Sequence, residues 1–96
     1  MLAEIYLTFQ GSLGGYLAAL RAAVSQRDGA GLATTAHGLK GAGASVGADW
    51  LADLARRLET FGRQGTLAGA EELLAELESE AGRVEVEIRE LLATVR

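Results

Sequence analysis

The sequence predicts an all-α protein, an antiparallel four-helix bundle with a short N-terminal lead helix. The 96 residues contain no proline, few aromatic residues and many alanine, leucine, glutamate and arginine residues, a composition that favours helices over sheets. Apolar residues recur at three- and four-residue spacings, and glycines separate these stretches. We expect residues 1–96 to form one domain, because the chain is too short for a second lobe that could enclose a substrate.

The first two predicted helices meet at Gly11. Residues 2–10 form an amphipathic lead helix that we expect to close one end of the bundle. Ser12 would cap the next helix, which carries a stripe of leucine and valine side chains. The apolar positions are Leu2, Ile5, Tyr6 and Phe9 in the lead helix, then Leu13, Leu17, Leu20 and Val24.

Two further helices are expected in the middle of the chain. Asp28 would cap the first of them, which extends to about residue 46 and turns Leu32, Leu39 and Val46 toward the core. Gly43, on the inward side, would let helices pack closely. The second spans about residues 48–63 and buries Leu51, Leu54, Leu58 and Phe61.

The last predicted helix carries a heptad pattern. Thr66 would cap it, and its apolar residues alternate four- and three-residue steps. They are Ala70, Leu74, Leu77, Ala81, Val84, Ile88, Leu91 and Val95. Such a seam could pair two chains as a coiled coil, but the other apolar helices of the same chain also need a partner. We therefore expect a monomer whose seam packs inside the bundle.

Composition excludes several classes of function. The formal net charge is −4 and no cluster of basic and aromatic residues occurs, so a nucleic acid is not an expected partner. Without cysteine there is neither a disulfide nor a thiolate metal site. The chain lacks a signal peptide and any apolar run of membrane-spanning length, so we expect a cytoplasmic protein that does not insert into membranes.

One histidine and one lysine give the best indication of function. His37 is the only histidine, and Lys40, the only lysine, follows it by about one helical turn. All other basic residues are arginine. Helical periodicity places this pair on the side of the helix opposite Leu32 and Leu39, so we expect the imidazole to face solvent.

The residues predicted around His37 are unusually small for an exposed helix face. They are Ala33, Thr34, Gly38, Gly41 and Ala44. Each glycine in a helix interior costs about 1 kcal/mol relative to alanine, which indicates that something requires them here. Long side chains at Gly38 and Gly41 would obstruct a macromolecule that approached the imidazole. This face is therefore a candidate partner-binding surface.

Several chemistries remain to be weighed at this histidine. An exposed histidine with a nearby lysine is also an ordinary feature of helix surfaces. A metal site is not expected, because no second histidine, cysteine or nearby carboxylate accompanies His37 on its helix. A hydrolase is disfavoured, because only Thr34 offers a hydroxyl within one turn. Covalent catalysis remains, in which the imidazole attacks a phosphoryl group and Lys40 neutralises the incoming charge.

The run from Ala36 to Ala48, which contains the core His37-Gly38-Leu39-Lys40-Gly41, resembles a histidine-containing phosphotransfer (HPt) domain. Leu51, Leu54, Leu58 and Glu59, which follow the run, fit the same family, and the resemblance covers nearly the whole chain. It implies a helical bundle in which His37 is the phosphoacceptor, Lys40 supports the phosphoryl group and Gly41 admits the partner.

The resemblance also implies the partners and the cofactor. The family passes phosphoryl groups between histidine and the aspartate of response-regulator receiver domains, including relays that contain hybrid sensor histidine kinases. It usually has no kinase activity of its own, so no cofactor is expected on this chain, and Mg²⁺ would be bound by the receiver. An adaptor bundle that binds signalling partners without being phosphorylated is the alternative.

The family suggests that a receiver helix docks on an apolar patch near the histidine. Tyr16 and Ala19 are candidates for this patch. Phe9 is a further candidate, but we expect it to belong to the core, because aromatic residues at helical spacing are more often buried than interfacial.

Overall fold

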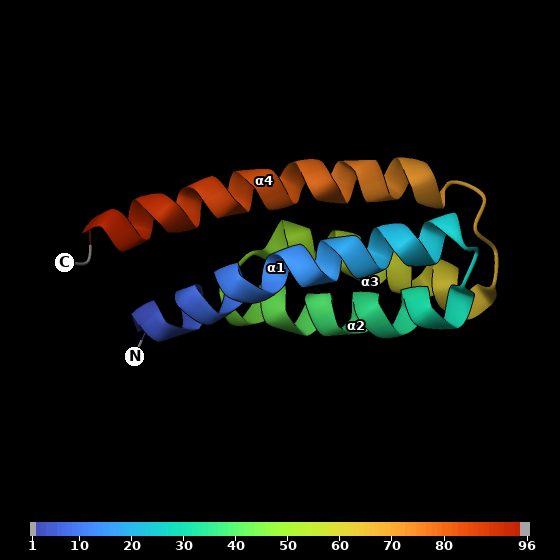
Figure 1. Cartoon of the computed structure of the whole chain (residues 1–96), viewed down its shortest axis with the longest axis horizontal. Coiled ribbons are helices and arrows are strands. Elements are labelled where there is room, and N and C mark those ends of the chain that lie inside the picture. The colour runs from blue at the N-terminus through green and yellow to red at the C-terminus, as the bar shows by residue number, and fades with distance from the viewer. Residues whose placement is uncertain (1, 95–96) are drawn as a thin grey trace.

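The computed structural model describes residues 2–94, the side chain of Leu2 excepted, as four helices joined by short connections (Figure 1). They are α1 (Leu2–Ser25), α2 (Gly29–Ser45), α3 (Asp49–Gln64) and α4 (Ala70–Thr94). Each helix packs on two others: α1 on α2, α2 on α3, α3 on α4, and α4 back on α1. The structure thus confirms the predicted four-helix bundle. No described helix is long and apolar enough to cross a membrane.

The separate lead helix was a wrong prediction. Helix α1 continues from Leu2 through Gly11 without a break, so residues 2–10 are its first turns. Ser12 does not cap a helix; its hydroxyl donates a hydrogen bond to the carbonyl of Thr8 at 3.0 Å, within the same helix. Phe9 and Leu13 are both buried in the core, so packing holds the helix on either side of Gly11. This packing outweighs the cost of about 1 kcal/mol of one helical glycine.

The core consists mainly of leucine side chains on the predicted stripes. The largest fully buried side chains are Leu13, Leu20, Leu32, Leu39, Leu51, Leu54, Leu58, Leu74 and Leu77. Leu17, Val46 and Phe61 are only partly buried, and Ile5 and Leu91 are exposed. The α4 seam is buried from Ala70 to Ile88, which confirms its packing inside the bundle. The side chain of Leu2 and the whole of Val95 lie outside the described residues.

The connections between helices follow their local chemistry. The backbone N–H of Gly31 donates to Asp28 Oδ1 at 3.0 Å, so Asp28 caps α2 as predicted. Thr66 does not cap α4, because α4 starts only at Ala70, after a turn in which Gly69 has a φ of +89°. A positive φ favours glycine, and this turn therefore delays the start of the helix.

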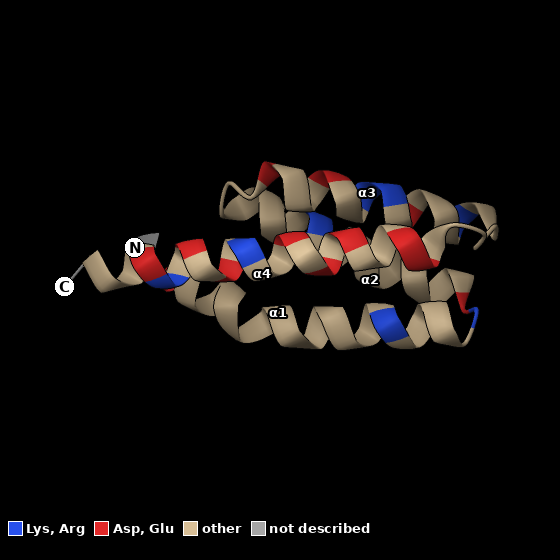
Figure 2. Cartoon of the chain, turned by 90° about the horizontal axis from the view of Figure 1, so that it is seen from above, with Lys and Arg blue, Asp and Glu red and all other residues tan. Residues whose placement is uncertain are grey.

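Ion pairs join α4 to α1 across the outside of the bundle. Acidic residues are spread along α4 (Figure 2). Arg21 of α1 binds Glu78 at 2.6 Å and Glu71 at 3.1 Å. Arg21 is solvent-exposed, so screening by water keeps the contribution of these pairs to stability small. They lie on helices other than α2, which carries His37.

Helices α2 and α3 come into close backbone contact at Gly62. A Cβ atom on Gly62 would lie 2.6 Å from both the Ala33 nitrogen and the Gly29 oxygen of α2. Farther along α2, a Cβ on Gly43 would contact the backbone of Ala48 and Ala52 at 3.5 Å, so Gly43 faces α3 as predicted. These glycines bring the two backbones together and so fix the position of α3 beside His37.

We expect Gly62→Ala to lower the free energy of unfolding by about 1–3 kcal/mol, because its Cβ would meet backbone atoms that cannot move aside. Gly14→Ala is the control. Gly14 is exposed in α1 with nothing within 4 Å of a Cβ, so alanine should stabilise the protein by about 0.5–1 kcal/mol. Urea unfolding measures both. If the two variants have equal stability, the close contact at Gly62 is wrong.

Candidate functional site

His37 lies on the solvent side of α2, as the helical periodicity predicted. Leu32 and Leu39 of the same helix are fully buried, whereas the side chain of His37 is 62% exposed. Lys40, one turn later, is 35% exposed. The imidazole is therefore accessible to a second protein, and the ammonium group lies on the same side of the helix.

A carboxylate from the neighbouring helix joins these two side chains. Glu59 of α3 accepts a hydrogen bond from His37 Nδ1 at 3.1 Å through Oε2, and its Oε1 lies 3.0 Å from Lys40 Nζ. Arg63, one turn after Glu59, donates to Oε2 through Nη2. We call Glu59, His37, Lys40 and Arg63 the Glu59 cluster. Its only acid is also its only buried member, since the Glu59 side chain is 6% exposed.

The cluster keeps Glu59 ionised. Hydrogen bonding from Lys40 lowers the pKa of Glu59 most, Arg63 and His37 lower it further, and burial opposes them; the result is a pKa of about 2. Among the described residues, every buried side-chain nitrogen or oxygen has a hydrogen-bond partner. Glu59 is therefore a satisfied, fixed negative charge beneath the imidazole.

This arrangement sets the protonation pattern of the His37 ring. A carboxylate can only accept hydrogen bonds, so in the neutral ring the proton sits on Nδ1 and points at Glu59. The lone pair is then on Nε2, which has no hydrogen-bond partner within residues 2–94. The hydrogen bond to Glu59 thus leaves the Nε2 lone pair unused and holds the ring in one orientation.

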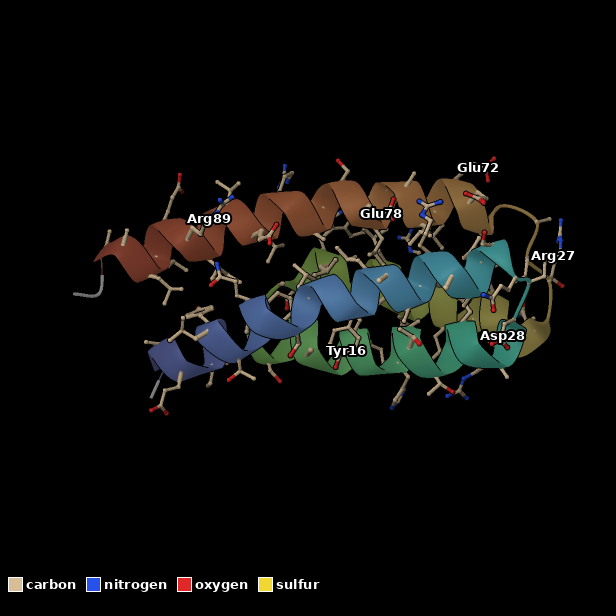
Figure 3. The ribbon with its side chains drawn as sticks, in the orientation of Figure 1. Tyr16, Arg27, Asp28, Glu72, Glu78 and Arg89 are labelled. Atoms are coloured by element: carbon tan, nitrogen blue, oxygen red, sulfur yellow. The ribbon has the colours of Figure 1, made fainter. Side chains whose placement is uncertain are left out.

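The small residues around His37 divide into two groups. Thr34, Gly41 and Ala44 are exposed, and Ala33 and Gly38 are half-buried. A Cβ on Gly41 would meet nothing within 4 Å, so its missing side chain leaves open surface. A Cβ on Gly38 would lie 3.0 Å from the ring of Tyr16, which reaches from α1 toward α2 (Figure 3). Packing against Tyr16 within the protein therefore accounts for a small residue at Gly38.

Tyr16 and its neighbours form a groove between α1 and α2. The groove is lined in part by Tyr16, Phe9, Ala42 and Val46. Tyr16 is half-buried, so part of the ring is available at the surface, whereas Phe9 is buried and belongs to the core, as expected. Ala19 is exposed.

Sequence reasoning did not assign roles to Glu59 and Arg63. The prediction that no carboxylate lies near His37 rested on its own helix alone, whereas Glu59 lies 22 residues away on the next helix. A signal was present, because Glu59 lies on the apolar side of α3, directly after Leu58 and three residues before Gly62. An acidic residue at a core position indicates a buried partner. No group of three potential metal ligands occurs among the described residues.

The Glu59 cluster predicts how stability depends on pH. The pKa of Glu59 falls from an ordinary value near 4.5 to about 2 on folding, so its stabilisation is complete above pH 4.5 and is lost as the pH falls toward 2. Glu59→Gln should cost about 2 kcal/mol at neutral pH. We expect the difference from the wild type to shrink toward zero at the acid end, measured by urea unfolding. A constant difference over this range would contradict the assignment.

Comparisons with known proteins agree on one fold and one family. The Hpt domain family model matches residues 4–96. The crystal structure of histidine-containing phosphotransfer protein B (HptB) from Pseudomonas aeruginosa PAO1 superposes with a TM-score of 0.93 at 30% sequence identity, covering 98% of this chain and 82% of that one. No curated protein matches the sequence. The chain belongs to the Hpt domain family, whose members transfer phosphoryl groups through histidine in phosphorelays.

Proposed function

We propose that His37 is the phosphoacceptor of this Hpt domain. It would take a phosphoryl group from the aspartyl phosphate of one receiver domain and pass it to the aspartate of another. The observation that carries the proposal is the exposed imidazole whose Nδ1 is bound to the buried carboxylate of Glu59, at 3.1 Å. His37 is the only histidine in the chain, so no second imidazole competes for this role.

The transfer step needs only one bond to form and one to break. The Nε2 lone pair attacks phosphorus, the N–P bond forms, and the P–O bond to aspartate breaks, leaving that aspartate as a carboxylate. The His37 ring keeps its Nδ1 proton and becomes positively charged. Glu59 accepts the hydrogen bond from this proton and stabilises the charge. Reverse transfer runs through the same atoms.

Lys40 would neutralise charge on the phosphoryl group. Its ammonium is held 3.0 Å from Glu59 Oε1, and it is partly exposed on a flexible stem, so it can reach outward without leaving the site. The chain would have no autonomous kinase activity and need no cofactor of its own, with Mg²⁺ and the acidic residues supplied by the receiver. Hybrid sensor histidine kinases would be the source of the phosphoryl group.

The surface around His37 supports docking of such a receiver. Gly41, Ala44 and Thr34 leave the imidazole prominent on α2, and Ala33 continues the low surface toward the start of the helix. Tyr16 and the groove behind it would contact a receiver helix, and Gly38 would serve indirectly by seating Tyr16. We propose that the protein does this as a cytoplasmic monomer.

The direct test is transfer from a panel of phosphorylated receiver domains to the purified chain. Wild type should acquire acid-labile label, and His37→Gln, which removes the nucleophile, should acquire none. Circular dichroism checks that both are folded. If a folded wild type accepts no label from any receiver but still binds one, the chain is an adaptor and His37 is not a phosphoacceptor.

Gly41→Arg should block receiver docking. A long side chain would stand on open surface one turn from His37, and the helix itself should be slightly stabilised, because arginine is a better helix former than glycine. We expect the transfer rate to fall at least about tenfold, the equivalent of losing one favourable contact. Gly82→Arg on α4, another exposed glycine with nothing within 4 Å, is the matched control and should transfer normally. Equal rates for the two variants would refute close approach at Gly41.

A further inference from the structure

The charge balance of the Glu59 cluster leaves one side chain without a role in the proposed transfer. That side chain is Arg63. A phosphoryl group brings a charge of about −1.5 to −2 at neutral pH. Glu59 stays ionised beside it, because its pKa is about 2. Lys40 supplies a single positive charge, part of which is already used by Glu59. Because Glu59 stays negative, Lys40 and the charged ring leave about one negative charge at the site, which a second cation would balance.

Arg63 is positioned to be that cation. Its guanidinium donates to Oε2 of Glu59, the same oxygen that binds His37 Nδ1, whereas Lys40 binds the other oxygen. Arg63 and Lys40 therefore bind different oxygens of the carboxylate that holds the imidazole. The Arg63 side chain is 68% exposed, so it can bind a group that lies outside the protein surface.

The surface between Arg63 and His37 has room for phosphoryl oxygens. Both side chains line one hollow, whose other walls are the small residues Ala30, Ala33, Thr34 and Gly62. The tight backbone contact of Gly62 with α2 keeps the base of this hollow fixed. Of the three guanidinium nitrogens of Arg63, only Nη2 donates a hydrogen bond to a described residue. The N–H groups of the other two can therefore bind an anion while Arg63 stays bound to Glu59.

We infer that Arg63 is a second phosphoryl-binding residue, which contacts the phosphoryl group of phosphorylated His37 from the hollow beside α2, on the side away from Lys40. The inference deepens the proposed function and rests on it. On this inference the phosphoryl oxygens lie in the hollow. Helix α3 then contributes two residues to the site: Glu59 binds the imidazole ring, and Arg63 binds the transferred group.

The test uses chemical phosphorylation, so that receiver docking does not enter. Phosphoramidate phosphorylates exposed imidazoles directly, and phosphorus NMR then follows the second ionisation of the phosphoryl group as the pH is varied. A nearby cation lowers that pKa. Arg63→Ala should raise it by about half a unit, the effect of one unit charge at a few ångströms in a solvent-exposed site. Arg63→Lys should restore most of the shift.

The matched control is Arg57→Ala. Arg57 lies on the same helix, has a side chain that is 47% exposed, and makes the same kind of pair with a carboxylate four residues earlier, Asp53. It should leave the phosphoryl pKa unchanged. If Arg63→Ala and Arg57→Ala give the same value as wild type, the inference is wrong.

A second comparison separates direct contact from an effect through Glu59. In a Glu59→Gln background no carboxylate remains for Arg63 to neutralise, so a direct contact still gives a higher phosphoryl pKa for Arg63→Ala. Loss of the effect in that background would overturn the inference. Transfer from receivers tests the proposed function separately, so either idea can fail while the other survives.

Discussion

The buried carboxylate of Glu59 is the interaction on which the site depends. It is an ionised group almost out of water, which is tolerable only because His37, Lys40 and Arg63 bind both of its oxygens. In return it orients the imidazole, holds the proton on Nδ1 and binds the side chains of Lys40 and Arg63 on the same carboxylate as the ring. The backbone contact at Gly62 also supports the site. It sets the distance between α2 and α3 that the hydrogen bonds of Glu59 require.

Helices α2 and α3 contribute differently to the site, because His37 lies outside the core and Glu59 lies inside it. Helix α2 presents Nε2 of His37, the nitrogen that we propose to be phosphorylated, on a surface of small residues, and α3 supplies the fixed charge of Glu59 from behind. An exposed nucleophile suits a protein whose reaction partner is another protein, since the partner can bring the remaining catalytic groups. It also explains how a bundle of four helices can take part in phosphoryl transfer without an enclosed active site.

The sequence was sufficient for the bundle, the core stripes and the pair His37 and Lys40, because these depend on periodicity within one helix. It did not reveal the Glu59 cluster, because a contact between residues 22 positions apart depends on how two helices face each other. The break expected at Gly11 was wrong for a related reason: a local glycine signal yields to core packing by Phe9 and Leu13. The sequence was interpreted to place Gly38 on open surface. In the structure the Tyr16 ring packs against Gly38.

The most direct test of this account is the tautomer of His37 in the unphosphorylated protein. Nitrogen NMR of the labelled imidazole, recorded with the ring in its neutral form, distinguishes the protonated ring nitrogen from the one that carries the lone pair. The account predicts a proton on Nδ1 and a lone pair on Nε2 in wild type, with a mixture of both tautomers in Glu59→Gln. A wild-type ring protonated mainly on Nε2 would mean that Glu59 does not orient the imidazole and would contradict the account.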